Sequence, residues 1–257
     1  MHYEVLGRRE AGVPTVLLSS GLGGLGSFWR PQLAALVARF RVIVYDQRGT
    51  GKSVAELPSD YSIAAMADDV LEIADRVGIA QMHFIGHALG GLVGMQVALQ
   101  SPQLIRRMIV INGWARADSH TARCFAVRKD LLRDSGVAAY VRAQPIFLYP
   151  APWLSANAQS ITDEEQHAIA HFPGTANTLA RIGALLKFDL SERLATMQVP
   201  TLVIAARDDV LVPYTCSEQL AVLLPASRLQ LLDSGGHGFT VTDAAGFNRA
   251  AIDFLQD

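Results

Sequence analysis

Short apolar runs recur along the chain, and turn residues and segments with helical spacing of apolar positions follow them. Short runs bounded by turns are typical of strands buried on both faces of a sheet. A helical pattern such as residues 63–77 between two runs implies right-handed crossovers between parallel strands. We therefore predict an α/β fold with a doubly wound, mostly parallel sheet. The runs assigned to strands are 14–18, 41–45, 82–85, 108–111, 201–205 and 229–232.

The alternation of strands and helices stops between roughly residues 113 and 199. This stretch has no strand signals and contains several helical patterns. An all-helical insertion after a strand is typical of a lid above the carboxyl ends of a parallel sheet. We therefore expect one domain over residues 1–257, with a helical cap at about 114–194.

Composition narrows the class of protein. A chain of 257 residues, half of them hydrophobic and 18% charged, suits one large domain with a buried sheet. A net charge of −2 with mixed signs gives no electrostatic reason to expect binding to nucleic acid or an acidic membrane. Cys124 and Cys216 lie far apart and form no metal-ligand spacing, so we expect no disulfide framework and no zinc site. We also expect no other metal and no cofactor. The start of the chain carries no basic and apolar leader, which favours a cytoplasmic setting.

The most informative segment is 84–91, where an apolar run enters Gly86-His87-Ala88-Leu89-Gly90 and a helical pattern follows. This is the strand–turn–helix setting of the G-x-S-x-G nucleophile elbow, with Ala88 at the serine position. Glycines suit both flanks because the central residue is strained and the strand and helix crowd together. Ala88 has no oxygen or sulfur, so covalent acyl-enzyme chemistry through this position is excluded.

Two side chains that could perform acid–base chemistry follow later strands. An acidic pair, Asp208 and Asp209, comes after the strand at 201–205, where a carboxylate points at the crevice. His237 lies in a glycine-rich loop after the last strand, which leaves its ring free to enter a pocket. We interpret His87 as packing within the elbow, with its side chain pointing away from the crevice.

A glycine-rich turn at 20–24 supplies the third element. Such a turn frees backbone N–H groups for an anion, and we expect Leu22 and Leu89 to provide the two donors. Residues 21–26 also match the dinucleotide pattern G-x-G-x-x-G. We reject that interpretation because no acidic residue ends the next strand in a way that fits a ribose; Asp46 opens a loop of its own.

Taken together, the order of elbow, acid and histidine around a helical insertion resembles the α/β-hydrolase family over essentially the whole chain. Residues 46–53 match the structural Asp-x-Arg-Gly-x-Gly-x-Ser loop of that family, and 209–213 match the Asp-x-Leu-Val-Pro spacing of its acid loop. The resemblance implies an α/β-hydrolase fold and selects Asp209 over Asp208 as the partner of His237. Ala88 is the departure from the family pattern.

A narrower resemblance accounts for this departure. The chain is similar to a branch of the α/β-hydrolase family that acts in pyrimidine utilisation. This resemblance implies an alanine elbow by nature and the hydrolysis of carbamate released during uracil breakdown; an older assignment is aminoacrylate hydrolysis. Cap sequences usually diverge most within this fold, so matches in the cap are the specific ones. The similar segments are 20–29, 45–51, 86–90, 112–114, 120–125 and 144–150.

The expected reaction needs an acid and an anion cradle but no attacking serine. We expect the Leu22 and Leu89 amides to hold the carboxylate and His237, oriented by Asp209, to supply a proton. Aminoacrylate hydrolysis would instead need His237 to activate water in the space beside Ala88. In either case the partner is a small molecule, and a homodimer is left open.

Two alternatives come from other classes. One is an ordinary serine esterase or C–C hydrolase carrying an engineered Ser-to-Ala change, which a serine codon in the natural gene would reveal. The other is a non-catalytic small-molecule receptor that keeps the pocket and lid. The retained Asp209 and His237 argue against the receptor, because a pure binder has no need of an oriented imidazole.

Overall fold

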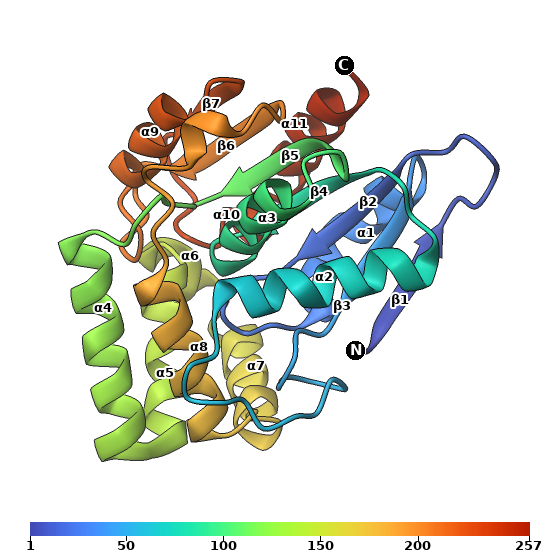
Figure 1. Ribbon diagram of the computed structural model, residues 1–257. Helices are drawn as coiled ribbons and strands as arrows, with labels where there is room; N and C mark the ends of the chain where they lie inside the picture. Colours follow the sequence, from blue (N-terminus) through green and yellow to red (C-terminus); the bar gives the residue numbers. More distant parts are fainter.

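A seven-stranded sheet forms the centre of the computed structural model, which describes residues 1–257. The strands lie in the order β1-β3-β2-β4-β5-β6-β7, and all neighbours are parallel except β1 and β3 (Figure 1). The predicted doubly wound, mostly parallel sheet is confirmed. The strands are β1 (Tyr3–Gly7), β2 (Thr15–Ser19), β3 (Arg41–Tyr45), β4 (Met82–His87), β5 (Ile105–Ile111), β6 (Thr201–Ala206) and β7 (Ser227–Leu232).

Helices cover both faces of the sheet. Alternate strand residues point to opposite sides, so Leu17 and Phe84 join one apolar core while Leu18 and Ile85 join the other. The first core is covered by α2 (Ile63–Val77), α3 (Leu89–Gln100) and α9 (Tyr214–Leu223). The second is covered by the short helix η1 (Gly26–Trp29), α1 (Arg30–Val37), α10 (Phe239–Thr242) and α11 (Ala244–Gln256).

Strand β1 is the one strand that the hydrophobic pattern did not predict. It pairs antiparallel with β3 at the edge of the sheet, and none of its residues is fully buried. An edge strand with partial burial lacks the continuous apolar run that marks the central strands.

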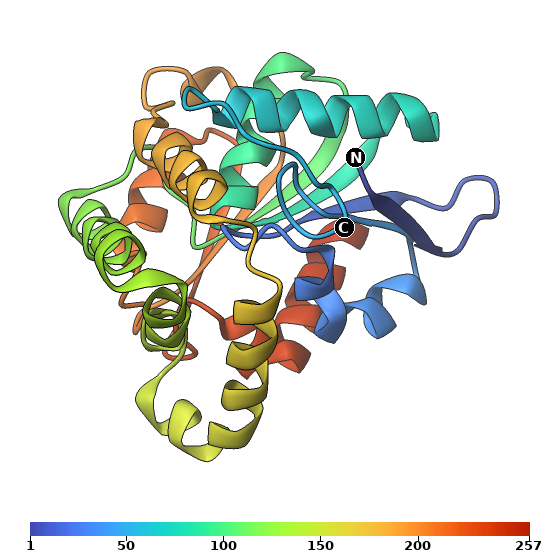
Figure 2. The same ribbon diagram turned by 90° about the horizontal axis from the view of Figure 1, so that it is seen from below.

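A group of helices separates β5 from β6. Figures 1 and 2 show these helices together at one end of the sheet. Arg116 and Asp189 form an isolated β-bridge, and Leu190 donates to the Ala115 carbonyl at 3.0 Å, so the insertion leaves and rejoins the sheet at one point. Its elements are α4 (Ser119–Asp130), the π-helical turn η2 (Leu131–Ser135), α5 (Gly136–Leu148), α6 (Ala151–Ala156), α7 (Ala158–Ala170) and α8 (Thr175–Lys187), and the short turn η3 (Leu194–Thr196) then leads to β6. None of the helices is long and apolar enough to cross a membrane.

Candidate active site

The elbow places Ala88 at a sharp turn between β4 and α3. Its φ of 46° and ψ of −112° are unusual for a residue with a side chain. Side chains at the flanking glycines would collide with backbone, Gly86 with Gly90 and Gly90 with Ser19. The turn therefore has the tight backbone of a nucleophile elbow, and a buried methyl group stands at its apex.

His237 and Asp209 form a buried pair after β7 and β6. The Nδ1 atom of His237 lies 2.7 Å from Oδ2 of Asp209. The other carboxylate oxygen accepts backbone hydrogen bonds from Leu211 at 2.8 Å and Val212 at 2.9 Å. Because a carboxylate is the acceptor, Nδ1 carries a proton and Nε2 is the nitrogen that can exchange one.

Asp208 holds the loop of the histidine rather than its ring. Its carboxylate accepts hydrogen bonds from the backbone of Gly235 at 3.1 Å and Gly236 at 2.8 Å. Both glycines have positive φ angles, 130° and 69°, which side chains rarely adopt. The two adjacent aspartates therefore divide the task, with Asp209 orienting the imidazole and Asp208 shaping the turn before it.

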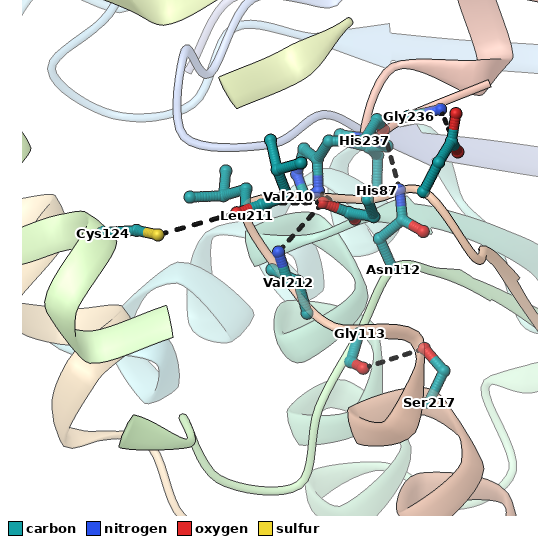
Figure 3. Close-up of polar contacts among 12 residues, drawn as sticks. His87, Asn112, Gly113, Cys124, Val210, Leu211, Val212, Ser217, Gly236 and His237 are labelled. Atoms are coloured by element: carbon teal, nitrogen blue, oxygen red, sulfur yellow. Dashed lines mark hydrogen bonds and ion pairs between the residues drawn. The ribbon is translucent and has the colours of Figure 1, made fainter. Parts of the chain in front are cut away.

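The expectation that the His87 side chain points away from the crevice is wrong. Its ring packs against the ring of His237 with centroids 4.8 Å apart, and its Nε2 donates to the His237 carbonyl oxygen at 2.9 Å (Figure 3). Burial, with a smaller contribution from the neighbouring His237, lowers the pKa of His87 to about 3. His87 is therefore neutral at physiological pH and supports His237 instead of exchanging protons.

Asn112 is a second support that sequence reasoning missed. It directly follows β5 with a φ of 49°, and its side-chain amide donates to the same His237 carbonyl at 2.7 Å. Asparagine tolerates this left-handed conformation better than most residues. The Asn112-Gly113 pair was a signal for a special backbone position, but the pattern could not show which group the side chain meets.

The glycine-rich segment 20–24, which we call the oxyanion loop, lies beside the elbow. A side chain at Gly21 would come within 2.9 Å of Nδ1 of His87. Gly24 donates to the Gly21 carbonyl at 3.0 Å, which closes the turn. The backbone N–H groups of Leu22 and Leu89 have no acceptor within the protein. Both are free to donate to an anion, as an oxyanion hole requires.

Polar side chains behind the oxyanion loop hold its carbonyl groups. Gln47 donates to the Ser20 carbonyl at 2.8 Å. Arg181 of α8 donates from Nε and Nη2 to the Leu22 carbonyl, at 3.1 and 3.0 Å. Sequence reasoning missed both residues, because hydrogen bonds between positions 27 and 159 residues apart leave no local pattern.

The insertion contacts both loops that carry the histidine and the acid. Gly238 donates to the Leu148 carbonyl of α5 at 2.8 Å. His120 of α4 donates from Nε2 to the Val210 carbonyl at 2.9 Å, and Cys124 points at the same carbonyl (Figure 3). The helices between β5 and β6 are therefore fastened to the candidate site at two places.

A cavity of about 800 Å³ lies elsewhere. It runs along the β1–β3 edge toward α7, and its lining includes Asp46 and His171 but none of Ala88, Asp209 and His237. Asp46 already accepts the backbone N–H groups of Gly26 and Lys52, each at 2.9 Å. Asp46 therefore holds backbone there, and the histidine–carboxylate pair in the lining, His2 and Glu4 at 3.4 Å, is exposed rather than buried. No group of three or more metal-binding side chains occurs in the structure.

Comparison with known proteins assigns the class. A family model described as the alpha/beta hydrolase fold matches residues 14–244. The crystal structure of the enol-lactonase from Burkholderia xenovorans LB400 is similar with a TM-score of 0.91 at 28% sequence identity, covering 100% of this chain and 96% of that chain. The chain belongs to the α/β-hydrolase fold family.

Two relatives place the chain more narrowly. One, from Stutzerimonas stutzeri (strain A1501), is 53% identical over 257 residues, covering 100% of this chain and 97% of the relative. Another, from Variovorax paradoxus (strain S110), is 54% identical over 256 residues, covering 99% and 96%. Both bear the name "Putative carbamate hydrolase RutD". Within the α/β hydrolases this chain belongs to the RutD family, which confirms the narrower resemblance.

Proposed function

We propose that the protein is a hydrolase acting on a C–N bond, which breaks carbamate down to ammonia and carbon dioxide in the catabolism of uracil and other pyrimidines. The name of the relatives supports this substrate. The observation that carries the proposal is the buried His237–Asp209 pair, 2.7 Å apart, beside an elbow whose apex is alanine. A site with an oriented imidazole and no nucleophile suits a reaction that needs a proton donor but no covalent intermediate.

In the proposed mechanism His237 is the acid. Protonated His237 donates its Nε2 proton to the carbamate nitrogen, while its Nδ1–H remains hydrogen-bonded to the Asp209 carboxylate. The C–N bond then breaks with its electron pair leaving on ammonia, and a carboxylate lone pair forms the second C=O bond of carbon dioxide. The Nε2 atom has no partner within the protein and is not completely enclosed. It is therefore available to a bound molecule.

The Leu22 and Leu89 amides have the complementary role in this proposal. They hold the carboxylate so that the carbamate nitrogen faces His237. General acid catalysis by a positioned group contributes roughly 10²–10⁴-fold. Because carbamate already decays quickly in water, an acceleration of this size is sufficient.

We further propose that the helical insertion, at about residues 114–194, is the cap of a single domain spanning residues 1–257. Its attachment to the acid and histidine loops through Val210 and Leu148 supports this role. The free, buried Cys124 and Cys216 suit a reducing cytoplasm. A homodimer is the proposed assembly, which sedimentation velocity tests directly.

The decisive experiment measures ammonia release from freshly dissolved carbamate. The parent protein should accelerate release over a protein-free control, and His237→Ala should abolish the acceleration. Ala88→Ser serves as the matched control, because it changes the same site yet leaves the acid in place, so much of the acceleration should remain. Equal rates for the parent, His237→Ala and the protein-free control would contradict the proposal and favour a small-molecule receptor.

A further inference from the structure

The guanidinium of Arg181 is buried directly behind the oxyanion loop. The residue is only 1% exposed and reaches from α8 to the Leu22 carbonyl through two hydrogen bonds. Nη2 also donates to the Gln47 side-chain oxygen. The remaining nitrogen, Nη1, is fully enclosed and has no partner. All of the acceptors around this cation are therefore neutral.

The positive charge of Arg181 has no counter-ion in the protein. No carboxylate lies within ion-pair distance of it. Burial lowers the pKa of Arg181 to about 10, so the side chain remains protonated at neutral pH. A buried, unpaired charge is costly, and an anion bound nearby would offset that cost.

A second buried arginine in the same insertion provides a contrast. Arg128 of α4 is 3% exposed, also lacks a carboxylate partner and also has one enclosed nitrogen, Nε, without a hydrogen-bond partner. Its guanidinium carbon, however, lies 5.1–5.7 Å from the ring centroids of Phe125, Tyr140 and Phe147, and it donates to the Tyr140 hydroxyl at 3.0 Å. Aromatic faces stabilise a buried cation. The environment of Arg128 therefore explains its charge, whereas that of Arg181 does not.

Leu22 connects the charge of Arg181 to the candidate site. Its carbonyl binds the guanidinium, and its N–H is one of the two free donors. One residue spans at most about 3.6 Å and each hydrogen bond about 3 Å, so an anion on this N–H lies within about 10 Å of the guanidinium. At that separation and an effective dielectric constant of about 20, the attraction between two opposite unit charges raises the affinity for the anion roughly tenfold.

We propose that Arg181 makes the site selective for small carboxylate anions over neutral molecules of the same shape. It does so without touching the ligand, by placing a positive charge within about 10 Å of the anion. The inference deepens the proposed function and rests on it for the location of the anion at Leu22. A purely structural clamp would instead affect anions and neutral molecules equally.

Bicarbonate and urea provide the test, because the first is a stable anionic isostere of carbamate and the second is its neutral counterpart. The affinity of each is measured by titration of the whole protein, followed by nuclear magnetic resonance. Arg181→Gln should weaken bicarbonate binding about tenfold and leave urea binding unchanged, whereas Arg181→Lys should retain the preference for bicarbonate. Arg128→Gln, the matched control, should also retain it.

Several outcomes would overturn the inference. These are a parent protein that binds bicarbonate no more tightly than urea, equal weakening of both ligands by Arg181→Gln, the same loss in Arg181→Lys, or the same loss in Arg128→Gln. A measurement on the parent protein needs no charge-removing variant. Bicarbonate should shift the ¹⁵N resonance of the Arg181 Nε–H, identified by its absence from Arg181→Lys, and an unmoved resonance would contradict the proposal.

This experiment is independent of carbamate turnover. Bicarbonate selectivity that depends on Arg181 in a protein without effect on carbamate would refute only the proposed function. Accelerated carbamate breakdown with unchanged selectivity in Arg181→Gln would refute only the inference about Arg181.

Discussion

At the scale of single residues, Ala88 decides which chemistry the fold can support. The backbone at this position keeps the strained φ of 46° that aims a nucleophile, yet the side chain ends at Cβ. His237, its partner Asp209 and the free amides of Leu22 and Leu89 all remain in place. One missing oxygen atom therefore separates this site from a serine hydrolase.

The absence of that oxygen predicts the response to serine-directed probes. A fluorophosphonate should not label the parent protein, and standard esters should turn over poorly, because no side-chain nucleophile is present. Ala88→Ser should create weak esterase activity, because it adds the nucleophile to an otherwise complete set of groups. Mass spectrometry of probe-treated protein and an ester assay check both statements. Labelling of the parent protein at another residue would contradict this account of the site.

Asn112 permits a prediction about the support of His237. Asn112→Gly keeps the left-handed backbone and removes only the hydrogen bond to the His237 carbonyl, which should cost about 1–2 kcal/mol of stability and slow any catalysed step. Asn112→Ala should cost more, because its side chain also disfavours the φ of 49°. Chemical denaturation of the two variants separates the contributions, and equal stabilities would show that backbone strain is unimportant here.

Two neutral, buried histidines predict how stability changes with pH. Burial lowers the pKa of His87 to about 3 and that of His83 to about 4, whereas both rise to about 6.5 in the unfolded chain. The unfolded state therefore binds more protons below pH 6.5. Stability should fall as the pH drops from about 6.5 toward 4, with each histidine contributing a slope of up to roughly 1.4 kcal/mol per pH unit.

Urea denaturation between pH 7 and 4.5 measures this slope. His83→Gln lies away from the candidate site and should reduce the slope without affecting the His87 contribution. An unchanged slope in His83→Gln would mean that His83 does not contribute to acid destabilisation.

At the scale of elements, the same residue type has opposite effects in two helices. Gly78 ends α2 with a φ of 70°, and the side chain of Ser62 caps the first turn of that helix. Gly183 lies inside α8, where a side chain would meet no atom within 4 Å. Glycine is thus suited to the end of α2 but weakens the interior of α8.

This difference predicts stability changes of opposite sign. Gly78→Ala should destabilise the protein by about 1 kcal/mol, because alanine disfavours the left-handed conformation. Gly183→Ala should stabilise it by about 0.5–1 kcal/mol, because alanine restricts the unfolded chain and favours the helix. Neither site offers a steric clash, so thermal unfolding of the pair isolates the backbone contribution. Destabilisation by Gly183→Ala as well as by Gly78→Ala would contradict the conclusion that glycine weakens the interior of α8.

At the scale of the whole molecule, the central sheet could be predicted because its strands are continuous apolar runs. The half-exposed β1 could not, since edge strands give a weak pattern. His237 and the acidic pair at 208–209 were accessible to sequence reasoning because each follows the carboxyl end of a strand, and the resemblance to the acid loop of the family then selected Asp209. The orientation of His87 and the contact of Arg181 with Leu22 were not, because both depend on packing between distant segments.

The single bridge between Arg116 and Asp189 has a consequence for how such proteins diversify. An insertion whose ends meet at one point can be exchanged between related chains without altering the order of the strands. Here, however, the exchanged piece would carry Arg181 and the Leu148 carbonyl that anchors Gly238 beside His237. A transplanted insertion would therefore change both the charge behind the oxyanion loop and the backbone contact that positions the loop of His237. Ligand preference and reactivity would then change together.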